Sequence, residues 1–347
     1  MKNRKIVVIS VGLIMISCVG LVAIYFNVFG ATHTVEDKNI KIGVTLYTRN
    51  DTFINSISNN LELAAKDMEM KKDERITLNI VSADGSQIKQ NDQIDTFIEQ
   101  NYDVLCVNIV DRTASSIIID KAKRANIPIV FFNREPVQED MNRWDKLFYI
   151  GSLASVTGNL QGQIIINILH DRFETVDCNG DGKIQYVLLE GEAGHQDASL
   201  RTEHCINALM NEGVEMEKLT GEYLYWKRDQ AFTKIKQWMQ TYGDDIELII
   251  ANNDDMALGA IDALKEMNLL DKRPLIVGVD ATEAGIQAIK DGILDGTVNI
   301  NSKQKAQLIF QMAYDLAWNN LIDETVKLVD GKYVFSDQSI VTKDSLK

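Results

Sequence analysis

The sequence lacks the short motifs that mark the common enzyme classes. No GxSxG segment is present, and no GxGxxG or GxxxxGK[ST] segment follows an expected strand. A serine hydrolase or a nucleotide-dependent enzyme would need one of these patterns to position a nucleophile or to hold phosphates. His195 with Asp197, and the paired acids Asp254 and Asp255, suggest catalysis only weakly, because no nucleophile stands beside a base. The sequence therefore favours a binding protein over an enzyme.

Cysteine is scarce. Apart from Cys18 near the N-terminus, the chain holds only Cys106, Cys178 and Cys205, and no CxxC pair occurs. An odd number of cysteines at irregular spacing provides no disulfide framework. Cys106 lies inside the apolar run DVLCVNIV, so we expect it in the core. These cysteines predict neither redox nor metal chemistry.

Positive charge is also in deficit. The chain has 36 Lys and Arg against 50 Asp and Glu, which gives a net charge of −14. A strongly acidic surface repels polyanions, so nucleic acid and anionic membrane surfaces are not expected partners. The composition is 45% hydrophobic and 25% charged, typical of a soluble globular protein. A chain of 347 residues is long enough for two domains.

The N-terminal segment differs from the remainder. Three basic residues come first, Lys2, Arg4 and Lys5, and no charge follows from Ile6 to His33. This stretch exceeds the roughly 20 apolar residues that span a bilayer, and the leading basic residues predict that the body lies outside the cytoplasm. We interpret residues 1–37 as a membrane anchor or signal segment. An uncleaved span, lipidation at Cys18 and simple secretion all remain open, and each places the body at the cell surface or in the periplasm.

Short apolar runs alternate with longer helix-like segments from residue 40 onward. Strands are expected at 40–47, 76–83, 103–110, 127–133, 184–191, 246–252 and 274–280. Helices are expected at 53–72, 89–101, 113–125, 154–173, 197–211, 229–241, 254–267 and 282–291. This alternation predicts βαβ units and parallel sheets. Because the pattern restarts near Gly151, we predict two doubly wound α/β lobes in tandem.

Polar segments follow five of the expected strands. They read YTRNDTF, NRE, EAGHQDASLR, NNDDM and DA. In parallel sheets, ligands bind beyond the carboxyl ends of the strands. Asp197, Asp254 and Asp280 are also credible helix N-caps, which is the plainer alternative for each. Five polar ends on converging strands nevertheless predict a ligand cleft between the lobes.

The segment DCNGDGKIQ (177–185) resembles the front half of an EF-hand calcium loop. Oxygen-bearing side chains fill positions 1, 3 and 5 and glycine fills position 6: Asp177, Asn179, Asp181 and Gly182. Position 12, which needs a bidentate glutamate, is Leu188. Glu190 and Glu192 are near in sequence but lie at or past the end of the following strand. The loop therefore predicts a calcium site with one ligand unassigned.

Together, these segments resemble a known family. IGVTLYTRNDTF, KQNDQID, IPIVFFNREP, DGKIQYVLLEGEAGHQDASLRT, IELIIANNDDMALGAIDALK and VGVDA are similar to segments of the galactose/glucose-binding proteins of bacterial sugar uptake and chemotaxis. The resemblance implies the type I periplasmic-binding fold, in which two α/β lobes joined by a three-segment hinge close over a hexose. It also implies one lobe from residues 38–150 plus about 300–334, and another from 151–299 plus about 335–347.

The resemblance further implies a set of sugar-binding residues. Phe53 and Trp226 would sandwich the pyranose ring, because aromatic faces cover its apolar sides. Polar groups would bind the hydroxyls through charge-assisted hydrogen bonds: Asp51, Asn133, His195, Asp197, Arg201, Asn253 and Asp280. A neighbouring tyrosine could take the place of Trp226. The family's asparagine after GTV corresponds to Asn299 or Asn301, and the spacing favours Asn299.

The same resemblance supplies a last ligand for the calcium loop. Glu247, sixty residues away, would provide the bidentate carboxylate. The other oxygens would come from the side chains of Asp177, Asn179, Asp181 and Gln185 and the backbone carbonyl of Lys183. The implied Ca²⁺ is structural and separate from the sugar.

The implied partners are a monosaccharide of the galactose or glucose class and an ABC sugar permease. A membrane-tethered sensor that passes its closed state to a chemoreceptor or a histidine kinase is the alternative. LacI-like repressors share the ligand-binding core, but the acidic charge and the lack of a DNA-binding headpiece argue against that reading. We expect a monomer, and the sequence leaves the choice between galactose and glucose open.

Overall fold

The computed structural model describes residues 39–347, apart from residues 73, 320 and 324–325. The predicted anchor or signal segment, with Cys18, lies outside the described residues. Within the described part of the chain, no helix combines the length and the apolar character needed to cross a bilayer.

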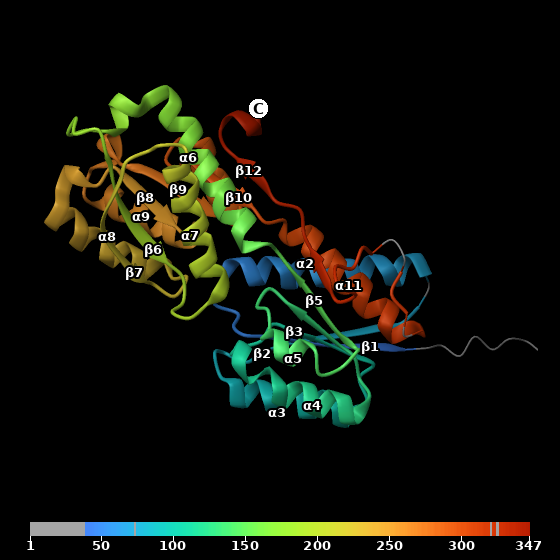
Figure 1. The fold of residues 1–347 in the computed structure, drawn as a ribbon. Helices are drawn as coiled ribbons and strands as arrows, with labels where there is room; N and C mark the ends of the chain where they lie inside the picture. Colours follow the sequence, from blue (N-terminus) through green and yellow to red (C-terminus); the bar gives the residue numbers. More distant parts are fainter. Residues whose placement is uncertain (1–38, 73, 320, 324–325) are drawn as a thin grey trace, which may run out of the picture.

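The first lobe is built on a parallel sheet in the order β11-β5-β4-β3-β1-β2 (Figure 1). Its strands are β1 (Ile40–Leu46), β2 (Ile76–Ser82), β3 (Val104–Val107), β4 (Ile129–Phe132), β5 (Leu147–Gly151) and β11 (Tyr333–Phe335). Its helices are α2 (Thr52–Lys72), α3 (Gln87–Glu99), α4 (Ser115–Ala125), the short α5 (Gln138–Met141) and α11 (Ser302–Asn319). Helices α2 and α11 lie side by side on one face of the sheet, and α3 and α4 cover the other.

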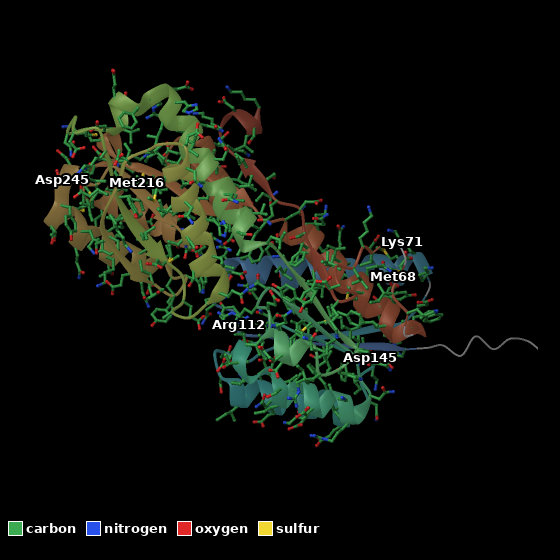
Figure 2. All side chains as sticks on the ribbon, in the orientation of Figure 1. Met68, Lys71, Arg112, Asp145, Met216 and Asp245 are labelled. Carbon is green, nitrogen blue, oxygen red and sulfur yellow. The ribbon has the colours of Figure 1, made fainter. Side chains whose placement is uncertain are left out.

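The second lobe repeats this plan with the strand order β12-β10-β9-β8-β6-β7. Its strands are β6 (Ile184–Glu190), β7 (Met216–Tyr223), β8 (Leu248–Ala251), β9 (Leu275–Val279), β10 (Gly296–Asn299) and β12 (Ser339–Val341), and β12 pairs antiparallel with β10. Its helices are α6 (Ala154–Val176), α7 (Gln196–Asn211), α8 (Arg228–Tyr242), α9 (Asp254–Glu266) and α10 (Glu283–Lys290). Figure 2 labels Met216 and Asp245 in this lobe and Lys71 and Asp145 in the first. The predicted two-lobe α/β class is confirmed.

Alternate residues of the central strands serve two separate cores. In β6, Tyr186 and Leu188 pack with α6 and α7, whereas Val187 and Leu189 pack with α8 and α9. A strand covered on both faces is apolar throughout, which is why these strands appear as continuous hydrophobic runs in the sequence. Cys106 is buried in β3, as predicted.

Close packing of α6 on α7 depends on glycine. A Cβ atom at Gly158 would lie 2.4 Å from the backbone oxygen of Arg201, and one at Gly162 would lie 2.8 Å from the Cβ of Ala208. The missing side chains let the two helices approach each other. This contact holds the backbone of Arg201 in place at the edge of the interlobe cleft.

Within the described residues, the chain crosses between the lobes after β5, after β10 and after β11. Serine hydroxyls join the crossing segments. Ser336 lies 3.1 Å from Ser152 and donates to the carbonyl oxygen of Ile300 at 3.1 Å. Ser302, at the start of α11, lies 2.8 Å from Ser56 of α2. We call these three connections, residues 152–153, 300–301 and 336–338, the hinge segments, because the lobes are connected through them.

Candidate functional site

A small cavity, with about 40 Å³ of free volume, lies between the two lobes. Its wall comes from loops that follow the carboxyl ends of strands in both lobes, and from the first turns of the helices after them. The lining residues are Tyr47, Asp51, Phe53, Asn133, Arg134, His195, Asp197, Arg201, Trp226, Asn253, Asp280 and Ile300. Every predicted sugar-binding residue except Asn299 is on this wall.

Three wall residues have unusual backbone angles. The φ values are +64° for Asn133, +65° for Trp226 and +115° for Asp280. Residues other than glycine rarely adopt a positive φ, and such backbone strain concentrates at ligand sites. The surrounding structure therefore holds these three side chains in positions that an ordinary turn would not provide.

Trp226 is the aromatic residue of its segment that reaches the cavity. Tyr223 and Tyr225, the alternatives in the sequence, are 41% and 50% exposed. The Trp226 indole lies against Gly191, where a Cβ atom would approach it to 2.1 Å. The His195 ring meets the indole edge-on at a centroid distance of 5.2 Å. Gly191 and His195 thus fix the Trp226 ring, which lines the second lobe's side of the cavity.

Asp51 is fixed by two hydrogen bonds at the start of α2. The Tyr47 hydroxyl donates to Asp51 Oδ2 at 2.6 Å, and the backbone N–H of Ile54 donates to Asp51 Oδ1 at 2.9 Å. Phe53 follows in the first turn of the helix and is 7% exposed. A carboxylate and an aromatic face are therefore presented together from the first lobe.

His195 and Arg201 carry buried polar atoms without partners. Within the part of the chain that the structure describes, neither His195 Nδ1 nor Arg201 Nε is hydrogen-bonded, although Arg201 Nη1 donates to the carbonyl oxygen of Asn252. Burial, reinforced by nearby arginines, lowers the pKa of His195 well below its usual value. The imidazole is therefore neutral and can both donate and accept a hydrogen bond.

Asp197 and Asp280 present open acceptors. Neither carboxylate accepts a hydrogen bond from a residue that the structure describes. Burial raises the pKa of both groups, and the positive charge of Arg201 opposes this rise. A ligand with hydroxyl groups could donate to these two carboxylates and also pair with the buried His195 Nδ1 and Arg201 Nε, which lack partners among the described residues.

The plainer reading of the three aspartates as helix caps is wrong. Helix α9 is capped by Asn253, whose Oδ1 accepts from the N–H of Met256 at 3.0 Å, and Thr282 caps α10. Helix α7 begins after His195 without a side-chain cap. Asp254 is instead a buried acceptor for the Thr297 hydroxyl at 2.6 Å and the Thr282 N–H at 2.8 Å.

The asparagine expected after GTV is not on the wall. Asn299 Oδ1 accepts from the N–H of Asn301, and Asn301 Oδ1 accepts from the N–H of Gln304 at the start of α11. Both amides are thus engaged in local turns, and Ile300 between them lines the cavity. The apolar character of Ile300 gave no reason to select it from the sequence.

Tyr47 and Arg134 are wall residues that were not among the predicted sugar-binding residues. The Arg134 guanidinium lies 3.8 Å from the centre of the Tyr47 ring and donates to Glu192 of the second lobe at 2.6 Å. A second contact between the lobes joins the Thr52 hydroxyl to Asp255 at 2.7 Å. Tyr47 and Arg134 lie in the polar segments that follow β1 and β4. The same segments contain Asp51 and Asn133, so the position after a strand could have identified all four residues.

The predicted calcium loop and Glu247 lie together in the second lobe. Glu247 is 1% exposed, and its two oxygens accept from the N–H groups of Cys178 at 2.6 Å and Gln185 at 3.0 Å. Asp177 accepts from three N–H groups of the loop, those of Gly180, Asp181 and Gly182. Over the described residues, no group of three or more His, Cys, Asp or Glu side chains converges closely enough to hold a metal ion.

Comparison with known proteins identifies the family. Residues 42–320 match the periplasmic binding protein domain. The chain is 36% identical over 288 residues to the D-galactose/methyl-galactoside binding periplasmic protein of Haemophilus influenzae, covering 83% of this chain and 84% of the relative. It is 26% identical to the xylitol-binding protein of Mycolicibacterium smegmatis, covering 95% and 94% of the two chains.

A solved structure shares the fold. The ABC transporter solute binding protein of Bacillus halodurans with bound myo-inositol superposes with a TM-score of 0.74 at 24% identity, over 90% of this chain and 98% of that chain. These relatives are substrate-binding proteins and not enzymes. The chain therefore belongs to the type I periplasmic binding protein family, an extracytoplasmic family that includes the sugar-binding components of ABC transporters.

Proposed function

We propose that this protein binds a monosaccharide of the galactose or glucose class between its lobes and delivers it to an ABC permease. The observation that carries the proposal is the composition of the wall of this interlobe cavity. Two aromatic side chains, Phe53 and Trp226, come from different lobes, and charged and amide groups are distributed around them. The 36% identity to a galactose-binding relative supports the choice of sugar class.

The chemistry of a pyranose matches this wall. Its hydroxyls each donate and accept, and they form a belt between two apolar faces. Asp51, Asp197 and Asp280 would accept from the hydroxyls, and Arg201 and neutral His195 would donate to them. A sugar lacking one of these hydroxyls would leave a buried group unpaired, which is the physical basis of selectivity.

Transport would use closure of the cleft. A ligand that contacts both lobes stabilises the closed state, and a permease can then recognise the closed surface. The Arg134–Glu192 and Thr52–Asp255 contacts already join the lobes around the cavity. A monosaccharide would add bonds that bridge Asp51 on one side with Asp197 and Asp280 on the other.

Isothermal titration calorimetry of the full-length chain in detergent tests this proposal. The panel contains D-galactose, D-glucose, D-ribose, xylitol, L-arabinose and myo-inositol. We expect D-galactose or D-glucose to bind more tightly than the others by at least about tenfold, or about 1.4 kcal/mol. A preference for a pentose or a polyol would reject the sugar class, and the absence of heat with every compound would reject sugar binding.

We also propose that the loop at 177–185 binds a structural Ca²⁺ with Glu247. The proposal is supported by an all-oxygen donor set, which calcium prefers, and by the hydrogen bonds that both ends of the loop donate to the Glu247 carboxylate. The side-chain ligands would be Asp177, Asn179, Asp181, Gln185 and Glu247, with the backbone carbonyl of Lys183, and the ion would have to draw together carboxylates that do not converge in this structure. When bound, the ion would neutralise the carboxylates and cross-link the loop to the start of β8.

A further inference from the structure

A second cavity lies beside the first, between the same two lobes. Its free volume is about 420 Å³, within the range of about 300–1,000 Å³ common for small-molecule sites. The first lobe contributes the segments after β3 and β4 to its wall, and the second lobe contributes the loop after β6. Three side chains, Arg134, His195 and Asp197, line both cavities. The two spaces therefore meet at these side chains.

The junction between the two cavities holds two buried polar atoms without partners. The Arg134 side chain is 7% exposed, and its Nε makes no hydrogen bond with any residue that the structure describes. The same holds for His195 Nδ1. An unpaired buried polar atom is costly. A ligand that passes through the junction could pair these atoms, because a glycosidic oxygen and the hydroxyls beside it offer both acceptors and donors.

Three half-buried side chains of the second cavity are also free to bind a ligand. Arg112, which lies near the boundary between the lobes (Figure 2), donates from its Nε to the carbonyl oxygen of Glu135 at 2.9 Å. Among the described residues, neither the Arg112 Nη groups, nor the Glu135 carboxylate, nor the Gln196 side-chain amide forms a hydrogen bond or an ion pair. Arg112 and Glu135 belong to the first lobe and Gln196 to the second. The cavity thus offers donors and acceptors from both lobes.

A third cavity, with a free volume of about 430 Å³, continues from the second. Arg112, Glu135 and Gln196 line both of them. The wall of the third cavity also includes Tyr333 and Phe335 of β11, whose rings lie nearly parallel, at an interplanar angle of 5°. Aromatic faces cover the apolar sides of sugar rings. The space beside the first cavity therefore combines polar and aromatic groups of the kind that bind sugars.

We propose that the protein binds disaccharides as well as free hexoses: with a hexose in the first cavity, a second sugar unit linked to it occupies the second cavity. This inference rests on the proposed function, since it places the second unit next to a bound hexose. The glycosidic link would pass the junction beside Arg134 and His195. The hydroxyls of the second unit would pair with Arg112, Glu135 and Gln196. The second cavity is lined by four acidic residues and two arginines, which favours a neutral ligand over an anion.

Calorimetric titration of the full-length chain in detergent compares a free hexose with disaccharides that carry it at the non-reducing end. For D-galactose, the disaccharides are lactose, which is β-linked, and melibiose, which is α-linked. For D-glucose, they are cellobiose and maltose. The titration uses the set that belongs to the hexose bound more tightly by wild type. We expect at least one disaccharide to bind with an affinity within about tenfold of that of the free hexose, or more tightly.

Arg112→Met and Gln196→Ala test the second cavity alone, because neither side chain lines the first. Each should weaken disaccharide binding by about five- to tenfold, the effect of one lost hydrogen bond, and change the hexose affinity by less than about twofold. The matched controls are Arg124→Met on α4 and Gln240→Ala on α8, which replace exposed side chains outside the three cavities. Both controls should leave both affinities unchanged.

The outcomes separate the two proposals. If the hexose binds but both of its disaccharides bind more than about tenfold more weakly, the inference is overturned. It is also overturned if R112M and Q196A lose the same factor for the hexose and for the disaccharide. Should R112M fail to fold, Q196A, which keeps every charge, provides the comparison. A wild-type chain that binds neither hexose nor disaccharide would instead overturn the proposed function, and the inference with it.

Discussion

The guanidinium of Arg134 donates a hydrogen bond to the carboxylate of Glu192 at 2.6 Å across the cleft between the lobes. Arg134 is 7% exposed and also donates to the carbonyl oxygen of Val110 at 3.0 Å. Its position is thus fixed within the first lobe, while its partner belongs to the loop after β6. The pair forms only if the lobes approach each other, so it contributes to the free energy of closure.

Glu192→Gln should weaken ligand binding without disturbing the cavity wall. The substitution removes the charge but keeps an acceptor, and Glu192 is partly exposed, so the expected loss is about fivefold in affinity, or about 1 kcal/mol. Calorimetric titration measures this loss, and small-angle X-ray scattering of the ligand-free chain should report a more open average shape. Asp262→Asn is the control, because its partner Arg228 lies in the same lobe. Equal affinities for E192Q and wild type would contradict a role of the pair in closure.

Phe53→Ala and Trp226→Ala should each reduce sugar affinity by about 10- to 100-fold. Each ring would lose the apolar contact with one face of the sugar, a contribution of about 1.5–3 kcal/mol. Tyr225→Ala removes an exposed ring from the same segment as Trp226 and should leave the affinity unchanged. If the tyrosine variant loses more affinity than W226A, the assignment of the aromatic wall is wrong.

Glu247→Gln should remove a dependence of stability on calcium. We expect the Tm of wild type to fall by several degrees when EDTA replaces Ca²⁺, because the loop at 177–185 loses its cross-link. The E247Q variant should have the lower Tm under both conditions, while its sugar affinity at low temperature stays close to wild type. Differential scanning calorimetry with and without chelator provides the measurement.

Glu190→Gln is the matched control for the calcium prediction. Glu190 forms an ion pair with Lys218 at 3.8 Å, on the edge strand β7. This variant should therefore keep the calcium dependence of wild type. A wild-type Tm that is identical in calcium and in EDTA would show that the loop holds no calcium, and the loss of calcium dependence in E190Q would move the last ligand to Glu190.

Asp254 predicts a pH dependence of stability. Burial raises the pKa of Asp254 to about 7 in the folded protein, whereas an unfolded aspartate titrates near 3.9. Between about pH 4 and pH 7, the folded state therefore holds a proton that the unfolded state has lost, and stability falls as the pH rises. The stabilisation that the Asp254 proton provides is fully present below about pH 4 and is lost as the pH rises through about 7.

Asp254→Asn isolates this contribution. The variant should be less stable at every pH, because it loses one of the acceptors for Thr297 and Thr282, at a cost of about 1–3 kcal/mol. The difference in unfolding free energy between wild type and D254N should shrink from pH 5 to pH 7, by up to about 1.4 kcal/mol per pH unit. Urea denaturation at both pH values provides the test. A constant difference would show that Asp254 titrates normally.

Much of the fold was predictable because buried parallel strands appear in the sequence as unbroken apolar runs. The strands β1, β6 and β9 were located to within one residue at each end for this reason. The edge strand β7, with the sequence MEKLTGEY, escaped prediction because it is largely solvated and carries polar residues. The positions of the short strands β11 and β12 depend on the hinge segments that precede or follow them, and local sequence patterns do not reveal where the chain crosses between lobes.

The site was predicted less evenly. Asp51 and Asn133 lie in segments that follow strands. They could be predicted from that position together with the family resemblance. Ile300 was not, because an apolar residue after a strand has an ordinary explanation in sequence. Its place on the cavity wall becomes visible only in the folded structure. The turn geometry that engages Asn299 is likewise a tertiary outcome.

The proposed function requires a monosaccharide in the cavity between Phe53 and Trp226 that contacts both lobes. A crystal structure of the protein grown with saturating D-galactose, and a second with D-glucose, tests it most directly. We predict density for a pyranose ring between the two aromatic side chains, with its hydroxyls bonded to Asp51 on one lobe and to Asp197 and Asp280 on the other. An empty cavity at saturating sugar, or a sugar bound to one lobe only, would contradict the account.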